Sequence, residues 1–137
     1  MKYLLDTNIC VYWLNGNKTI EEKAVQVGLK HVAISFITLS ELYYGAYKSQ
    51  KVQQNLTALK NLESKLKRVE SNKEICKAFG ELKAELAKEG KIIDDADLFI
   101  VCCALKSNRV VVTNNEKHFS RIKGLKIENW AKIPGKV

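Results

Sequence analysis

The sequence predicts an α/β fold, namely a three-layer α/β/α sandwich with a mostly parallel central sheet. Short apolar runs suited to buried strands alternate with longer segments at helical spacing. The clearest strand is Val110-Val111-Val112-Thr113, whose continuous β-branched run is typical of a strand covered on both faces. With 137 residues, a globular composition and no repeat, the chain is expected to form one domain over residues 1–137.

The first half of the chain predicts strands and helices in the order β-α-α-β-α. Tyr3-Leu4-Leu5 is a short apolar run that Asp6 ends, and Asn15-Gly16-Asn17 is a typical helix stop. The β-branched run Val32-Ala33-Ile34 predicts a second buried strand. The expected elements are therefore a strand at 3–5, helices at 9–14 and 19–27, a strand at 32–34 and a helix at 38–47.

Two amphipathic helices are expected in the middle of the chain. Leucines at positions 56, 59, 62 and 66 recur at helical spacing within 51–66, and a second apolar face runs through 74–89. We expect these helices to form an antiparallel hairpin at one side of the sheet, with a short strand around Val69. The remaining expected elements are a helix from Asp94, as its cap, to Leu105, the strand at 110–113, a short helix at 117–122 and a last strand at 125–127.

Composition and charge narrow the class of protein. The formal charge of +8 favours polyanionic partners such as RNA or an acidic protein segment. Asp6 interrupts the N-terminal apolar run, so we expect a cytoplasmic protein without a signal peptide or membrane span. The four cysteines lack metal-ligand spacing and are expected to be reduced packing residues. The sequence has no P-loop, G-x-G-x-x-G or H-E-x-x-H motif, which disfavours nucleotide-driven and zinc chemistry.

Residues with side-chain oxygens follow the predicted strands. Asp6 ends the first strand, and Asn115 follows the strand at 110–113. Asp97 lies in the first turn of the helix before that strand, and Glu41 lies in the helix after the second strand. Because ligands of open parallel sheets bind at the carboxyl ends of the strands, we expect these four side chains to converge.

The three carboxylates would need a compensating charge. Each neighbours a leucine rather than the lysine-rich surface, so they are expected near buried backbone, where an unpaired charge is costly. A divalent Mg2+ or Mn2+ ion takes oxygen ligands, polarises a phosphodiester and lowers the pKa of a bound water. Taken singly, each residue has another interpretation: Asp6 and Asp97 suit a cap or the dipole of a helix, and Glu41 suits an exposed helix position.

Four ordered motifs connect the sequence to a known family. It resembles PIN domains, over nearly its whole length, at Leu5-Asp6-Thr7-Asn8, Ser40-Glu41-Leu42, Asp97-Leu98-Phe99-Ile100 and Val112-Thr113-Asn114-Asn115. The ending from His118 to Trp130 is similar to the close of VapC-type toxins of toxin–antitoxin pairs. The resemblance implies that residues 1–137 form a single PIN domain.

The same resemblance implies an activity and partners. It implies an endoribonuclease toxin that depends on Mg2+ or Mn2+ and cleaves RNA phosphodiester bonds through a metal-activated water. Relatives with a similar tail suggest tRNA as the target. A cognate VapB-type antitoxin is expected to neutralise the toxin, and the chain is expected to form a homodimer.

Site residues follow by motif position. Asp6, Glu41 and Asp97 take the family's acidic metal-site and catalytic positions. Asn115 takes the fourth catalytic position, where many members carry Asp, so one-metal and two-metal mechanisms both stay open. The residues expected to orient a carboxylate or a water by hydrogen bonds, without binding the metal, are Thr7, Asn8 and Thr113.

Other charged residues near the motifs are expected close to the site but not as metal ligands. Asp94 and Asp95 lend negative charge, with helix capping preferred for Asp94. His118 stands where relatives often carry an acid, and an exposed histidine is preferred over a general acid. The candidate RNA contacts, which the sequence does not rank, are Lys48, Lys51, Lys117, Arg121 and Lys123.

Two competing classes remain. A phosphatase of the haloacid-dehalogenase type also places Asp after its first strand, but it needs a second Asp two positions later, where this chain has Asn8. A non-catalytic RNA-binding module would need aromatic stacking residues and no carboxylate cluster. Tyr43, Tyr44 and Tyr47 are candidates for stacking, although their apolar helix favours core or dimer packing.

Overall fold

A computed structural model describes residues 1–131 of the protein. The last six residues of the expected domain lie outside the described residues. In chain order the elements are β1 (Tyr3–Leu5), α1 (Thr7–Leu14), α2 (Lys18–Val27), the 3-10 helix η1 (Leu29–His31), β2 (Val32–Ser35), α3 (Phe36–Tyr47), α4 (Val52–Lys65), β3 (Lys67–Val69), α5 (Lys73–Lys88), α6 (Asp95–Ser107), β4 (Val110–Val112), α7 (Glu116–Phe119) and β5 (Ile127–Glu128).

The strands form one sheet in the order β3-β2-β1-β4-β5, and all the pairings between described strands are parallel. At the centre, Leu4 of β1 pairs with Ala33 of β2 and Val111 of β4. The carboxyl ends of the strands therefore share one edge of the sheet. The predicted α/β class with a parallel central sheet is confirmed.

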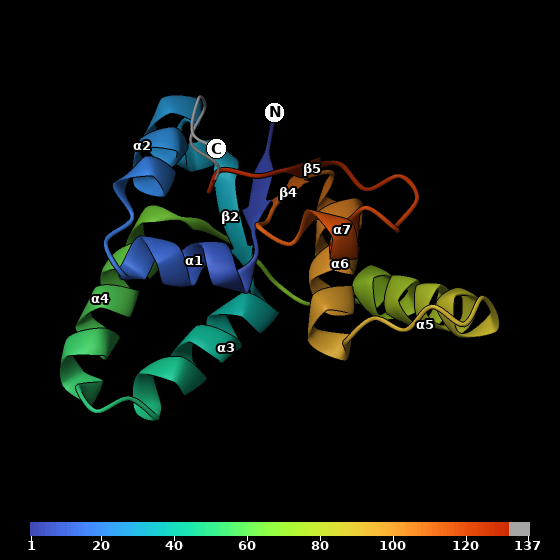
Figure 1. The fold of residues 1–137 in the computed structure, drawn as a ribbon, viewed down its shortest axis with the longest axis horizontal. Helices are drawn as coiled ribbons and strands as arrows, with labels where there is room; N and C mark the ends of the chain where they lie inside the picture. The colour runs from blue at the N-terminus through green and yellow to red at the C-terminus, as the bar shows by residue number, and fades with distance from the viewer. Residues whose placement is uncertain (132–137) are drawn as a thin grey trace.

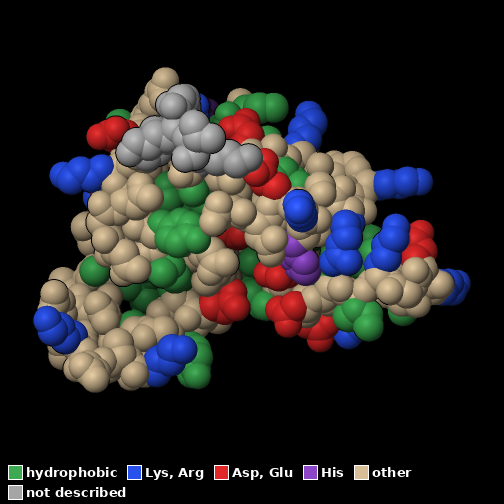
Figure 2. Space-filling view, in the orientation of Figure 1, with side chains coloured by type: hydrophobic (Ala, Val, Ile, Leu, Met, Phe, Trp, Pro, Cys, Tyr) green, Lys and Arg blue, Asp and Glu red, His purple; other side chains and the backbone are tan. Residues whose placement is uncertain are grey.

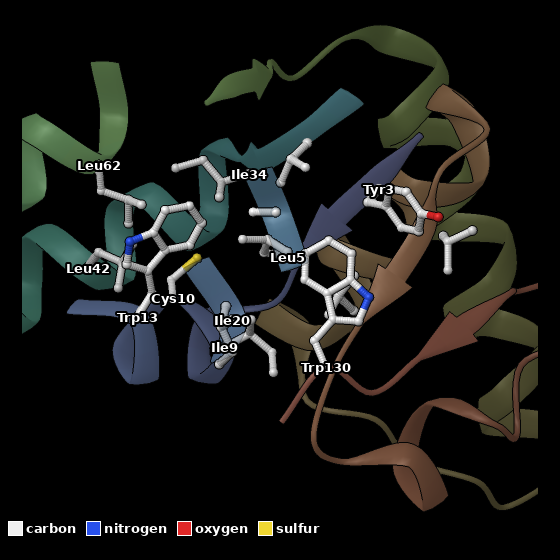
Figure 3. Packing of buried hydrophobic residues seen from close by; sticks show 14 of the residues in the cluster. Tyr3, Leu5, Ile9, Cys10, Trp13, Ile20, Ile34, Leu42, Leu62 and Trp130 are labelled. Atoms are coloured by element: carbon white, nitrogen blue, oxygen red, sulfur yellow. The ribbon is translucent and has the colours of Figure 1, made fainter. Parts of the chain in front are cut away.

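Alternate strand residues fill two separate cores. Leu5 and Ile34 face a core made with α1 to α4, in which Trp13 and Trp130 are buried (Figure 3). Leu4 and Val111 face the opposite core, made with α5, α6 and the segment around α7. Figure 1 shows the sheet between these two helical layers. The three-layer sandwich follows from the two-residue period of strands whose two faces are both apolar.

Side-chain caps fix where the helices begin. Asp6, Asn17, Ser35 and Asn72 each accept a hydrogen bond from a backbone N–H in the first turn of the following helix. Such a cap satisfies a donor that has no partner inside the helix. Helices α1 and α3 consequently start directly after β1 and β2, at the carboxyl edge of the sheet.

The expected hairpin of the two middle helices is wrong. Leu59 and Leu62 of α4 belong to one core, whereas Ile75 and Leu86 of α5 belong to the other. Helix α4 packs on α3, and α5 packs on α6. The physical reason is β3, which pairs with β2 at the edge of the sheet, so that the chain passes from one face to the other.

Smaller differences concern ends and surfaces. The last strand is Ile127–Glu128 rather than 125–127, and the short helix ends at Phe119 rather than at 122. Tyr44 and Tyr47 are 66% and 63% exposed, so neither packs in the core of the chain as their apolar helix suggested. None of the helices within residues 1–131 is long and apolar enough to cross a membrane.

Candidate active site

Asp6 is the most constrained carboxylate at the carboxyl edge of the sheet. Its side chain is only 4% exposed. One oxygen, Oδ1, accepts the backbone N–H of Ile9 at 3.0 Å, and the other, Oδ2, accepts the hydroxyl of Thr113. Thr113 is fully buried, and its Oγ1 accepts the N–H of Asn115 at 2.9 Å. Asp6 is therefore a helix cap, as one interpretation held, and it is also fixed to the strand that carries the fourth motif.

Glu41 reaches the same place from α3. The hydroxyl of Thr7 donates to Glu41 Oε1 at 2.5 Å and lies 3.1 Å from the hydroxyl of Thr38. Thr38 is completely buried, whereas Glu41 is exposed. Because Thr7 follows Asp6 directly, this contact holds the exposed carboxylate of Glu41 beside the buried carboxylate of Asp6.

Asp97 comes from the first turn of α6 and has a histidine partner. Its Oδ2 lies 3.0 Å from Nε2 of His118, and the two side chains are 34% and 23% exposed respectively. The expectation that His118 is an exposed histidine is wrong. Phe119, the next residue, is 1% exposed, and its burial turns the short helix α7 so that the imidazole faces Asp97.

Burial and neighbouring charges raise the pKa values of Asp6 and Asp97. Burial raises the pKa of Asp6 above its ordinary value, the bonds from Thr113 and Ile9 oppose this, and the charges of Asp97 and Glu41 raise it further. Burial also raises the pKa of Asp97, where His118 opposes the rise and Asp94 adds to it. Carboxylates whose pKa values are raised by burial and by a neighbouring acid are typical of functional sites.

Other residues of the predicted site are less constrained. Asn115 is exposed, and its side chain makes no hydrogen bond to another described residue, although its backbone is tied to Thr113. Asn8 is likewise exposed without a side-chain bond inside residues 1–131, so the expected support of a carboxylate by Asn8 is not found. Asp94 occupies the cap position of α6, but its side chain accepts no capping bond. Asp95 pairs with Lys83 at 2.9 Å.

Sequence reasoning missed two contributors to this arrangement. Thr38 supports Thr7, and Ser35, which is buried, caps α3 and so sets the direction in which Glu41 points. A signal for Ser35 exists, because a serine directly before an apolar helical run is a typical N-cap. The contact between His118 and Asp97 has no local signal, since the two residues meet only through the fold.

The donor set suits a hydrated divalent cation. Within residues 1–131, no three Asp, Glu, His or Cys side chains stand close enough to surround an ion on their own. Mg2+ typically takes only one or two protein carboxylates and keeps several waters, so two acids at this edge are sufficient. Asp6 keeps free lone pairs despite its two bonds, because an ionised carboxylate accepts at about four positions. A cation held by Asp6 and Asp97 would offset the negative charge of Asp97 that raises the pKa of Asp6.

The surface around the acids is divided by charge. Figure 2 shows acidic side chains gathered where α3 and α6 approach each other, a histidine beside them, and Lys and Arg side chains over the neighbouring α7 and α5. On the other side, a groove between α1, α3 and α4 begins at Thr7 and Glu41 and continues along Val11, Leu42 and Leu59. The site therefore opens between a basic surface and a largely apolar groove.

A parallel sheet with carboxylates at its carboxyl edge defines the class of this protein. The family model described as the PIN domain matches residues 3–125. The chain therefore belongs to the PIN-domain family. The family expected from the four motifs is confirmed.

Within this family the similarity extends over full length to VapC proteins. Ribonuclease VapC2 of Rickettsia felis is 41% identical over 134 residues, which cover 96% of this chain and 100% of that protein. The tRNA(fMet)-specific endonuclease VapC of Shigella flexneri is 31% identical, covering 96% of this chain and 99% of that protein. The structure of VapBC2 from Rickettsia felis, bound to a DNA fragment from their promoter, has a TM-score of 0.88 at 39% identity, covering 95% of this chain and 99% of that one.

Proposed function

We propose that this chain is a VapC-type toxin, an endoribonuclease that cleaves RNA with the help of Mg2+ or Mn2+ at the acidic site. The observation that carries the proposal is the buried Asp6, held by Ile9 and Thr113 while the charges of Asp97 and Glu41 raise its pKa. Carboxylates whose pKa values are raised by burial and by neighbouring acids are concentrated at functional sites. The names of the VapC relatives support a ribonuclease.

Asp6 and Asp97 are the residues that would hold the cation, with Glu41 as a third ligand or as the group that orients the attacking water. When bound, a divalent cation neutralises charge on the phosphate and makes water a better nucleophile near neutral pH. The fit rests on side chains that are all oxygen donors and on a site partly open to solvent, as Mg2+ and Mn2+ require.

The chain's own residues prepare an in-line displacement. Thr113 and the N–H of Ile9 fix both oxygens of Asp6, so that this carboxylate does not rotate. Thr7, supported by Thr38, leaves Glu41 one oxygen that is not used by the threonine. If Glu41 orients the attacking water, that oxygen accepts a proton from the water as the water oxygen bonds to phosphorus. The bond from phosphorus to the leaving oxygen then breaks, and the leaving oxygen keeps the electron pair and takes a proton from solvent.

Because the side chain of Asn115 is neutral, we favour a mechanism with one cation over a mechanism with two. Its amide does not balance a second positive charge, whereas Asp at this position would. It lies near Thr113 with a free side chain, so it can hydrogen-bond a substrate phosphate or a water.

The partners we propose are RNA, with tRNA as the first candidate, and a VapB-type antitoxin. The groove between α1, α3 and α4, about 210 Å³ in volume, supports docking of an amphipathic antitoxin segment, because its apolar walls end at Glu41. A basic side chain of that segment would pair with the acids and block the cation. We also propose a cytoplasmic homodimer, and light scattering on the purified chain tests the dimer directly.

The experiment compares wild type with Asp97→Asn and the control Asp95→Asn on total cellular RNA. Each protein is incubated with Mg2+, Mn2+ or EDTA, and new RNA ends are mapped by sequencing. We expect discrete cuts that need metal, that persist in Asp95→Asn, whose partner is Lys83 on the surface, and that vanish in Asp97→Asn. Equal binding of RNA by all three proteins with no cutting under any metal would replace the proposal with a non-catalytic RNA-binding module.

A further inference from the structure

Arg121 is held in one position beside the acidic site. Its Nε donates to the carbonyl oxygen of His118 at 3.2 Å, and its Nη2 donates to the carbonyl oxygen of Ile92 at 3.3 Å. Nη2 also lies 3.4 Å from Nδ1 of the His118 ring. An arginine with three such contacts loses much of the conformational freedom that an exposed side chain normally keeps.

The charge of Arg121 has no acidic partner among residues 1–131. Its contacts are two backbone carbonyls and an imidazole ring. Arg68, by contrast, pairs with both Glu63 and Glu70. The guanidinium of Arg121 is therefore fixed in orientation, but no carboxylate neutralises its charge. An anion-binding arginine is expected to have both properties.

His118 connects this arginine to the site. One ring nitrogen, Nδ1, faces the guanidinium of Arg121, and the other, Nε2, lies 3.0 Å from Oδ2 of Asp97. A single imidazole ring thus separates the guanidinium from a carboxylate of the site. The other basic candidates lack such a link: Lys48 lies over the ring of Tyr44 at 4.7 Å, and Lys51, Lys117 and Lys123 are exposed without a side-chain partner in the described part of the chain.

We propose that Arg121 is the phosphate-binding residue of the substrate site, and that it grips the RNA phosphate adjacent to the bond that is cut. The proposal rests on the proposed ribonuclease function. A polyanion approaching Asp6, Glu41 and Asp97 meets negative charge, so a fixed cation at the rim is needed to bring the backbone in. The planar guanidinium has five N–H donors. Nε and both N–H groups of Nη2 face the carbonyl oxygens and the imidazole, so the two N–H donors of Nη1 are left for phosphate oxygen. His118 is then a positioning residue that spaces this clamp from Asp97.

The test uses a 5′-labelled tRNA(fMet) transcript as the probe. Wild type, Arg121→Ala and Arg121→Lys are compared with the control Arg68→Ala, which removes an arginine that is already paired with acids. RNA affinity is measured by fluorescence anisotropy in EDTA over a series of NaCl concentrations. Cleavage is measured separately in Mn2+ at saturating protein, and thermal unfolding is recorded for every variant.

For Arg121→Ala we expect a cleavage rate about 100-fold lower, as for the loss of one charge-stabilising donor. We also expect the slope of log affinity against log salt to become shallower by about 0.7, as for the loss of one phosphate contact to a single strand. Arg121→Lys keeps the charge, so its salt slope should match wild type, while its rate falls about 10-fold because an ammonium group cannot keep all the Nε and Nη2 contacts that hold this cation in place. Arg68→Ala should match wild type in both.

Two outcomes separate failure of this inference from failure of the function. If wild type cuts the transcript and both Arg121 variants keep its rate and salt slope, Arg121 only ties α7 to the loop at Ile92 and the proposal is overturned. The proposal is equally overturned if the rate falls only in step with a lower unfolding midpoint. If wild type cuts neither this transcript nor total RNA in any metal, the ribonuclease proposal fails together with the inference that depends on it.

Discussion

Replacing Asp6 separates its structural role from its proposed catalytic role. Asp6→Asn keeps an oxygen that can accept the N–H of Ile9, and its amide can donate to Oγ1 of Thr113. It removes the buried charge and the acceptor for the hydroxyl hydrogen of Thr113. Asp6→Ala removes both hydrogen bonds as well. We expect both variants to lose RNA cleavage, and we expect Asp6→Ala to be the less stable of the two.

The loss of stability in Asp6→Ala follows from the two hydrogen bonds that it removes. Loss of a helix N-cap costs about 1 kcal/mol. The hydroxyl of the fully buried Thr113 then has no acceptor for its hydrogen, which costs about 1 to 3 kcal/mol. Removal of a carboxylate whose pKa is raised by burial offsets part of this. The net destabilisation of Asp6→Ala is about 2 kcal/mol, a fall of about 7 °C in Tm for a domain of this size.

Asp6→Asn should be more stable than Asp6→Ala at pH 7, because it keeps the cap of α1 and a hydrogen bond to Thr113. Its stability relative to wild type should depend on pH. Because the pKa of Asp6 is raised in the folded state, the folded protein binds a proton more tightly than the unfolded chain. Wild type therefore gains stability as pH falls through the raised pKa towards the ordinary value near 3.8. The unfolding free energy of Asp6→Asn relative to that of wild type is therefore highest above the raised pKa and falls as pH drops below it.

The assay is urea unfolding followed by fluorescence of the buried Trp13 and Trp130, in EDTA so that metal binding does not contribute. Measurements at pH 4, 5.5 and 7 cover the pH range in which Asp6 is expected to gain its proton. The reasoning is refuted if Asp6→Ala is as stable as Asp6→Asn, because Asp6 would then hold neither α1 nor Thr113. It is also refuted if the difference in unfolding free energy between Asp6→Asn and wild type does not change with pH.

Three further predictions rest on the same geometry. Mn2+ at 100 times its Kd should raise the unfolding free energy of wild type by about 2.7 kcal/mol and leave Asp97→Asn unchanged, as calorimetry and thermal unfolding will measure. Thr7→Val should lower the cleavage rate about 10-fold or more, because Glu41 loses its donor, while the exposed Thr57→Val should have no effect in the same kinetic assay. Mn2+ affinity should weaken as pH falls through the raised pKa values of Asp6 and Asp97, because protons compete for the carboxylates; an affinity that is constant between pH 5 and 8 in calorimetric titration would contradict this.

The sequence predicted the sheet and the acids because both have local signals. In an α/β chain, runs such as Val110-Val111-Val112 predict a buried central strand. The carboxyl ends of parallel strands lie at the same edge of the sheet. The positions of Asp6 and Asp97 followed from these rules. The metal and the catalytic roles of Glu41 and Asn115 stay predictions.

What the sequence did not predict depends on packing between distant elements. An amphipathic pattern predicts that a helix has an apolar face, but it does not predict which face of the sheet that helix covers. For this reason the expected pairing of α4 with α5 was wrong. The contact of His118 with Asp97 depends on the burial of Phe119 and on the approach of α7 to α6. A polar pair of this kind leaves no periodic pattern in the sequence.

The central claim is that cleavage depends on a cation held by these carboxylates. It is tested most directly by the first-order rate of cutting of a labelled RNA as a function of Mn2+ concentration, for wild type, Asp97→Asn and Asp95→Asn. We predict that wild type and Asp95→Asn reach the same plateau with rising Mn2+, while Asp97→Asn stays at background throughout. Cutting by wild type at an equal rate in EDTA, or by Asp97→Asn at the wild-type rate, would contradict the claim.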